Sequence, residues 1–181
     1  DLHSTSRRQR QMCIRDSSEY SLLDGACRIK KIVKKVKELG QTAIAVTDHG
    51  VMYGAVDFYR EALAAGIKPI IGCEVYVAPR TRFDKEAKLD SRPFHLILLC
   101  KNNKGYQNLI KLVSLSYTEG FYSKPRVDLE ILEKYSDGLI CLSGCIAGEI
   151  AKKLINREYE SAKKAALNYE RIYGKGNYYL E

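Results

Sequence analysis

Asp48 and His49 give the clearest signal of side chains suited to chemistry, and they lie in the segment Thr47-Asp48-His49-Gly50 directly after an apolar run. If that run is a parallel strand, both side chains lie at its carboxyl end, where loops converge and α/β proteins bind ligands. An Asp-His pair in that place can bind a metal ion or act as an acid/base pair. The alternative is that the pair only caps a loop, and the pattern alone leaves both interpretations open.

Glu74 is the second candidate, because it lies inside the apolar run 69–77. A carboxylate in a buried strand is costly unless it is paired or bound to a cation. We therefore predict a functional role for Glu74.

His95 and Cys145 are weaker candidates when each is taken alone. His95 is the second residue of the apolar run 94–100, where a hydrogen-bonded core histidine is the simpler interpretation. Cys145 follows the apolar run 139–142 and is a potential soft metal ligand, although free buried cysteines are common. Histidine, glutamate and cysteine donors together suit zinc or manganese. Their spacing is too long for a zinc finger, so the fold would have to assemble any such site.

Alternating strands and helices are predicted to position these residues. The clearest helix is 28–39, where apolar residues form one stripe and lysines occupy the other positions before Gly40 ends the helix. Short apolar strands between helices predict parallel βαβ units, in a barrel or a doubly wound sheet. The predicted strands are 43–47, 69–77, 94–100, 139–142 and 178–180, and the predicted helices are 28–39, 56–65, 106–117, 149–155 and 159–173.

The composition is that of one globular domain, with 181 residues of which 45% are hydrophobic and 29% charged. No apolar run approaches the length of a membrane span, and the N-terminal residues do not form a secretion signal. The six cysteines include no Cys-x-x-Cys pair, which indicates free thiols in a reducing, cytoplasmic setting. The net charge of +8 fits either a polyanionic partner or solvated lysine faces on helices.

The two ends of the chain differ from its middle. Residues 1–17 carry neither a strand nor a helix pattern, and we interpret them as a disorganised leader that is not native to the protein. The organised region 18–181 stops as the strand at 178–180 begins, so we expect further sequence after Glu181. The expected fold class is therefore α/β, with an incomplete barrel truncated at its C-terminal end.

Several segments of region 18–181 resemble, in order, the polymerase-and-histidinol-phosphatase (PHP) domain of bacterial DNA polymerase III alpha subunits. They are Ser18-Glu19-Tyr20-Ser21-Leu22-Leu23-Asp24-Gly25-Ala26, Ala45-Val46-Thr47-Asp48-His49-Gly50, Tyr53-Gly54-Ala55, the segment 65–77, Phe94-His95-Leu96, Gly105-Tyr106-Gln107-Asn108-Leu109 and Leu142-Ser143-Gly144-Cys145.

This resemblance implies a distorted β/α barrel that holds up to three metal ions at the carboxyl ends of its strands. Such ions lower the pKa of a bound water and clamp a phosphate diester. The resemblance also implies catalytic roles for Asp48 and His49, with Asp48 as a supporting group. The metal ligands that it implies are Asp24, His49, Glu74, His95 and Cys145.

The implied function is that of a fragment of a replicative DNA polymerase, a nucleotidyltransferase whose magnesium-dependent polymerase site lies outside this chain. The PHP piece would perform 3′ to 5′ exonucleolytic proofreading, or serve as a scaffold on which metals are structural. The implied partners are DNA, a proofreading exonuclease subunit and the sliding clamp. The alternative is a stand-alone PHP phosphoesterase, such as a relative of histidinol-phosphatase.

The chain departs from the family pattern at its beginning. The family motif His-x-His-Ser corresponds here to Arg15-Asp16-Ser17-Ser18, so both histidines are absent. A later Asp-x-His pair of the family would follow Glu181. We therefore expect an incomplete metal site in this chain.

Overall fold

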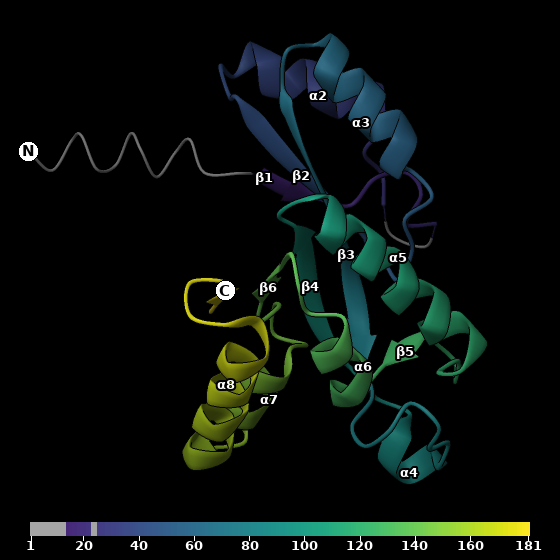
Figure 1. Cartoon of the computed structure of the whole chain (residues 1–181), viewed down its shortest axis with the longest axis vertical. Coiled ribbons are helices and arrows are strands. Elements are labelled where there is room, and N and C mark those ends of the chain that lie inside the picture. Colours follow the sequence, from purple (N-terminus) through teal and green to yellow (C-terminus); the bar gives the residue numbers. More distant parts are fainter. Residues whose placement is uncertain (1–13, 23–24) are drawn as a thin grey trace, which may run out of the picture.

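The computed structural model describes residues 14–22 and 25–181, which form a twisted sheet with helices around it (Figure 1). This arrangement confirms the expected α/β class. The strands are β1 (Ile14–Asp16), β2 (Ala43–His49), β3 (Lys68–Val77), β4 (Phe94–Cys100), β5 (Arg126–Val127), β6 (Leu139–Leu142) and β7 (Tyr178–Tyr179), and the helices are α2 (Ile29–Glu38), α3 (Ala55–Ala64), α4 (Ala87–Asp90), α5 (Asn103–Thr118), α6 (Leu129–Lys134), α7 (Glu149–Ile155) and α8 (Tyr159–Tyr173).

Four short elements were not predicted from the sequence: β1, α4, β5 and α6. Each has six residues or fewer. A segment of that length spans less than two helical turns or a few strand positions, so it carries too little hydrophobic periodicity to be recognised. The longer elements lie where the apolar patterns predict them.

The sheet is open within the described residues. Its strand order is β1-β2-β3-β4-β6-β7, and β5 pairs with β3 beside this path. The strands β1 and β7 are therefore the two edges, and they do not pair with each other. An open, mostly parallel sheet is what an incomplete β/α barrel has.

The prediction of purely parallel strands was wrong for β4. This strand runs antiparallel to both β3 and β6, whereas β1, β2 and β3 are parallel. The reason lies in the link 78–93, which folds into a compact loop at the end of β3 instead of crossing back. Arg80 Nε donates a hydrogen bond to Asp90 Oδ1 at 3.0 Å and so closes this loop. As a result, the first residues of β4 lie beside the last residues of β3.

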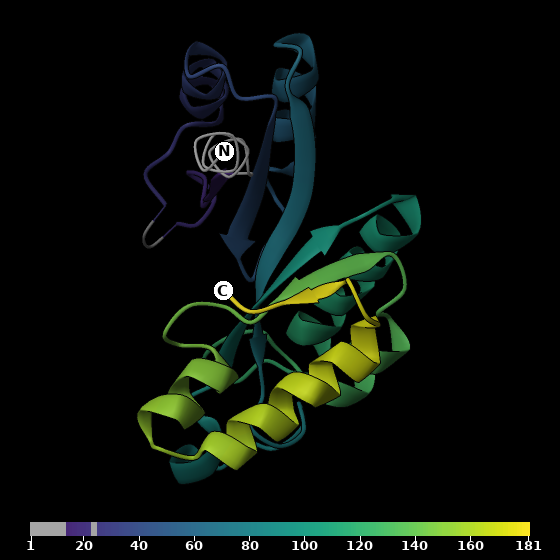
Figure 2. The ribbon, with the colours of Figure 1, turned by 90° about the vertical axis from the view of Figure 1, so that its left-hand side faces the viewer.

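Two hydrophobic clusters form the core. One cluster joins α2 and α3 to β2, and the other joins α5, α6 and α8 to β3, β4 and β6. Figure 2 shows α2 and α3 at one end of the molecule and α7 and α8 at the other. The residues of β3 that belong to the second cluster are Cys73, Val75 and Val77. Because side chains alternate along a strand, Glu74 and Tyr76 lie on the opposite face of the sheet.

Residues 14–16, for which the sequence shows no strand pattern, belong to the sheet. Ile14–Asp16 forms β1 and pairs in parallel with residues 44–46 of β2. Residues 1–13 lie outside the described residues, and the division of the chain at residue 17 stays a prediction.

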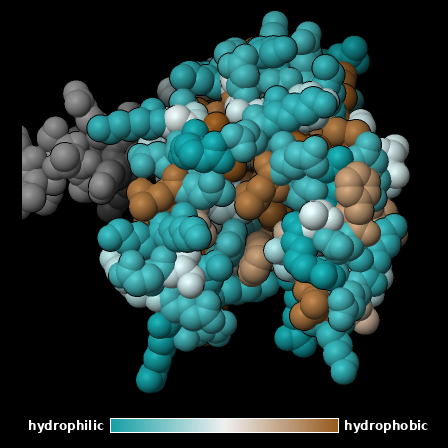
Figure 3. All heavy atoms as spheres, turned by 60° about the horizontal axis from the view of Figure 1, so that its bottom comes forward, coloured by the Kyte–Doolittle hydropathy of each residue, from teal (hydrophilic) through white to brown (hydrophobic). Residues whose placement is uncertain are grey.

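Several large hydrophobic side chains are exposed on the surface. Leu22, Ile146 and Leu180 are each more than two thirds exposed. On the face turned forward in Figure 3, hydrophobic residues gather in the middle, between groups of hydrophilic residues. None of the helices in the described part of the chain is long and apolar enough to cross a membrane.

Candidate functional site

The candidate residues come together where β2 and β3 end and β4 begins. His49 lies opposite Glu74 in the parallel pair, and Tyr76 lies opposite His95 in the antiparallel pair. Residues directly opposite each other project from the same face of a sheet. The reversed direction of β4 therefore brings His95 to the same edge and face as His49 and Glu74.

Glu74 is the centre of this group. Its Oε1 lies 2.7 Å from His95 Nδ1 and 3.7 Å from His49 Nε2. The carboxylate is buried, with 7% of the side chain exposed, whereas about a quarter of each imidazole is exposed. The structure thus places two imidazoles at the solvent-facing side of one buried carboxylate.

The hydroxyl of Ser17 adjoins this group. Its Oγ lies 3.2 Å from His49 Nε2 and donates a hydrogen bond of 3.5 Å to the Thr47 carbonyl. Ser17 is one of the two positions at which the family pattern has histidine. A side chain at position 17 therefore reaches the candidate site directly.

Asp48 faces the other side of the sheet from His49. Its buried carboxylate accepts hydrogen bonds from the Ser18 backbone N–H at 2.6 Å, from the Ser18 hydroxyl at 2.8 Å and from the Ser21 hydroxyl at 2.9 Å. The Ser21 hydroxyl also accepts a hydrogen bond from the His49 backbone N–H at 3.1 Å. This geometry favours the supporting role predicted for Asp48, since it fixes the segment after β1 against the end of β2.

The other two predicted ligands are Asp24 and Cys145. Asp24 lies outside the described residues. Cys145 is exposed, although its loop is tied to β4 because the His95 backbone N–H donates to the Ala147 carbonyl at 3.1 Å. The Cys145 loop is thus anchored at the start of β4, while the Cys145 side chain is absent from the pocket described next.

A pocket of about 380 Å³ opens beside the group. Its volume lies within the range typical of small-molecule sites. The side chains that line it include His49, His95, Lys124 and four tyrosines, at positions 20, 53, 76 and 117. A partly buried, aromatic-lined pocket therefore adjoins the candidate ligands.

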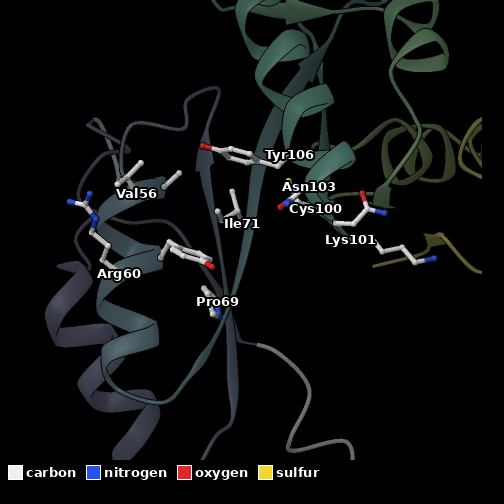
Figure 4. A pocket seen from close by; sticks show the side chains of 11 residues that line it. Val56, Arg60, Pro69, Ile71, Cys100, Lys101, Asn103 and Tyr106 are labelled. Carbon is white, nitrogen blue, oxygen red and sulfur yellow. The ribbon is translucent and has the colours of Figure 1, made fainter.

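A different pocket, of about 330 Å³, lies at the opposite end of β3 and β4 (Figure 4). It is bounded by α3, by Ile71 of β3 and by the start of α5, which contributes Tyr106. Of the predicted site residues that the structure describes, none lines it. We therefore place the candidate functional site at the His49–Glu74–His95 end.

Cys73 lies behind the site and has a structural role. Its thiol donates to the Asp48 carbonyl at 3.3 Å, and the side chain is fully buried. Burial, reinforced by the nearby Asp48 charge, raises the pKa of the Cys73 thiol far above its ordinary value. Cys73 is therefore a neutral thiol rather than a ligand or nucleophile.

Sequence reasoning did not single out Ser18, Ser21, Tyr76 or Lys124. The alternation of side chains in β3 places Tyr76 on the face of Glu74, so this residue had a detectable signal. The two serines are three residues apart in a loop and carry no pattern that points to Asp48. Lys124 lies in a segment without periodicity, and nothing in the sequence associates it with His49.

The donors present fit a divalent cation in kind. Two imidazole nitrogens and a carboxylate oxygen are ligands that zinc and manganese accept. Within residues 14–22 and 25–181, however, no group of three or more histidine, cysteine, aspartate or glutamate side chains is already arranged to hold a metal ion. The expectation of an incomplete metal site in this chain stays a prediction.

Comparison with known proteins identifies related sequences. The family model described as the PHP domain matches residues 15–181. DNA polymerase III subunit alpha of Borreliella burgdorferi is 49% identical over 97% of this chain and 15% of its own length. The subunit of Chlamydia pneumoniae is 56% identical over 74% of this chain and 11% of its own length. The chain thus spans only a small part of these relatives.

Two solved structures show a distant overall similarity. An amidohydrolase from Chromobacterium violaceum, with bound sulfate and no metal, has a TM-score of 0.47 and 13% identity, over 88% of this chain and 82% of that protein. A putative metal-dependent phosphoesterase from Bifidobacterium adolescentis has a TM-score of 0.48 and 9% identity, over 88% and 83% respectively.

Proposed function

Because this chain belongs to the PHP domain family, we propose that it is the PHP portion of a DNA polymerase III alpha-type subunit and binds a divalent cation through His49, Glu74 and His95. The family match confirms the resemblance seen in the sequence. The observation that carries the cation proposal is the buried Glu74 carboxylate between two imidazoles. Zinc and manganese are the cations that these donors suit best.

The chemistry proposed for this site is hydrolysis of a phosphate ester. A bound divalent cation supplies a water of lowered pKa and a contact for a phosphate oxygen. Glu74 and the imidazoles of His49 and His95 would hold the cation. Asp48 and Ser21 keep His49 at the end of β2, so they act as positioning residues.

The whole protein would then be a DNA-directed DNA polymerase. By this proposal its nucleotidyl-transfer site and magnesium ions lie in other domains, and DNA is its substrate. A proofreading exonuclease subunit and the sliding clamp are its proposed partners, in the cytoplasm. The support for this part is the similarity to the relatives named above, which are much longer than this chain.

Cation binding by a Glu74→Gln variant tests the site. We expect this substitution to weaken Mn²⁺ and Zn²⁺ binding, measured by calorimetric titration, by at least about tenfold, because it removes the carboxylate charge between the two imidazoles. Glu149→Gln is the matched control. The partly buried Glu149 carboxylate accepts a hydrogen bond from the Tyr169 hydroxyl at 3.0 Å, but it lies outside the site. Equal affinities in all three proteins would refute the assignment.

A structural role for the cation is a second candidate. Its support is the replacement of the two family histidines by Arg15 and Ser17, together with the lack of a preformed group of metal ligands within residues 14–22 and 25–181. In that case the cation would raise the unfolding temperature by mass action. The unaltered chain would nevertheless cleave a single-stranded oligonucleotide with Mn²⁺ no faster than the Glu74→Gln variant does. Faster Mn²⁺-dependent cleavage by the unaltered chain would favour the phosphoesterase.

The stand-alone phosphoesterase is a weaker alternative. The Treponema pallidum relative is also a DNA polymerase III subunit alpha, with 49% identity over 91% of this chain. Hydrolysis of histidinol phosphate at a rate above that of an oligonucleotide end would instead support the stand-alone enzyme.

A further inference from the structure

Lys124 brings a positive charge into the pocket beside the candidate site. Its Nζ lies 4.2 Å from the centre of the Tyr76 ring, and that ring meets His95 edge-on at 5.1 Å. His95 in turn contacts Glu74. A cation–π contact of this kind holds an ammonium group in place without neutralising its charge. Lys124 and His95 therefore both contact the Tyr76 ring, and His95 belongs to the proposed cation site.

The backbone around Lys124 is held tightly. The Tyr122 N–H donates to the Lys124 carbonyl at 3.0 Å across Ser123, whose φ of 59° is uncommon for a residue other than glycine. The next residue, Pro125, packs against Gly50, where a β-carbon would lie 3.0 Å from Pro125 Cγ. Strained backbone of this kind persists where the surroundings fix it, and it is frequent at binding sites. The turn thus presents Lys124 at a fixed place on the pocket rim.

The pocket also offers aromatic surface. Tyr53 is 67% exposed and Tyr117 is 40% exposed, and both line the pocket together with Lys124. Exposed aromatic rings stack on flat aromatic groups, and a nucleobase is such a group. The volume of about 380 Å³ accommodates a ligand of the size of a nucleotide.

We propose that Lys124 is the anion-binding residue of this pocket and that Tyr53 and Tyr117 are its base-stacking wall. The pocket then selects phosphate esters that carry an aromatic group, of which a nucleotide is the representative. This inference rests on the proposed function for its biological meaning, because it names the substrate class of that site. Its geometry is independent of the cation, since Lys124 and the tyrosines are outside the proposed ligand set.

Titration of the chain with thymidine monophosphate, inorganic phosphate and thymidine tests the inference without any metal. In the presence of a chelator, we expect Lys124→Gln to weaken binding of thymidine monophosphate and phosphate by about tenfold, because a hydrogen bond to a charged group is lost. Tyr53→Ala should weaken binding of thymidine monophosphate and thymidine, and leave phosphate unchanged. Calorimetry or ligand-observed NMR measures both effects.

Lys134→Gln is the matched control, because Lys134 also lies over a tyrosine ring, that of Tyr135 at 5.4 Å, but away from the pocket. Lys124→Arg should retain binding, since it keeps the charge and the ring contact. Equal phosphate affinity in the Lys124→Gln and Lys134→Gln variants would overturn the role of Lys124. Equal affinities of the unaltered chain for thymidine monophosphate and phosphate would overturn the aromatic wall.

The two proposals fail separately. If Mn²⁺ binding is unaffected by Glu74→Gln but phosphate binding depends on Lys124, the cation site is refuted and the anion site stands. If Mn²⁺ binding depends on Glu74 but nucleotide binding is indifferent to Lys124, the reverse holds.

Discussion

The Asp48 carboxylate accepts two hydrogen bonds from Ser18, one from its backbone N–H at 2.6 Å and one from its hydroxyl at 2.8 Å. Both residues are buried, so water cannot readily replace these hydrogen bonds. Loss of either bond would therefore cost free energy of folding. The pair joins the segment that follows β1 to the end of β2, directly before His49. A side chain that the sequence suggested for catalysis therefore also maintains the position of the site.

Replacement of Asp48 by asparagine should destabilise the fold. The amide group would present a donor where Ser18 and Ser21 donate, so we expect a loss of about 2 kcal/mol in the free energy of unfolding. Urea unfolding followed by circular dichroism measures it. Asp57→Asn is the control, since Asp57 accepts an exposed hydrogen bond from the Tyr20 hydroxyl at 2.9 Å, and the substitution should cost less than about 1 kcal/mol. Similar losses in both variants would contradict the structural role of Asp48.

Replacement of Arg126 should strongly destabilise the fold. Its buried guanidinium donates to the backbone carbonyls of Gly120, Asp90, Arg82 and Asp84 at 2.8 to 3.2 Å. Arg126→Met leaves these carbonyls without their donor, and we expect a loss of about 3 kcal/mol or more. The control Arg171→Met removes an exposed ion pair with Glu133 and should cost at most about 1 kcal/mol.

Asp90 should make stability depend on acidic pH. The Arg80 guanidinium lowers the pKa of the Asp90 carboxyl from 3.8 to about 2. A lowered pKa in the folded state stabilises the protein above the unfolded pKa, and this contribution is lost as pH falls from about 4 to about 2. Urea unfolding at several pH values should therefore show that the free energy of unfolding falls more steeply at acidic pH for the unaltered chain than for Asp90→Asn. Parallel curves would contradict the Arg80–Asp90 contact.

The longer elements of this fold follow from local pattern. An apolar stripe at helical spacing, with lysines at the other positions, predicts α2, and runs of apolar residues predict β2, β3, β4 and β6. The direction of β4 does not follow from such a pattern. It depends on contacts of Arg80 with Asp90, and the local sequence does not reveal which residues pair across a loop.

The candidate site was predictable in its residue types and not in its arrangement. The cost of burying Glu74 was evident from its apolar neighbours in the sequence. His49 and His95 were candidates because they lie at the ends of predicted strands. Their meeting on one face depends on strand register. The contacts of Asp48 with Ser18 and of Lys124 with Tyr76 join separate segments, so only the folded chain reveals them.

Alkylation of Cys145 tests the ligand that the structure leaves outside the group. Its exposed thiol should react readily with iodoacetamide in the metal-free chain. If Cys145 is a ligand, as the family resemblance implies, Zn²⁺ should slow this reaction at least about tenfold, because a coordinated thiolate is shielded. Mass spectrometry of the labelled peptides measures it, and half-buried Cys27 is the internal control. An unchanged rate would remove Cys145 from the ligand set.

Ser17→His should strengthen cation binding. The Ser17 hydroxyl lies 3.2 Å from His49 Nε2, so an imidazole at position 17 would add a nitrogen donor beside Glu74 and the two existing histidines. We expect an increase of at least about tenfold in Zn²⁺ affinity by calorimetric titration, which corresponds to about 1.4 kcal/mol. Ser114→His on the exposed side of α5 adds the same group away from the site and should leave the affinity unchanged. An equal gain in both variants would mean that added imidazoles bind zinc nonspecifically and that position 17 does not face a cation site.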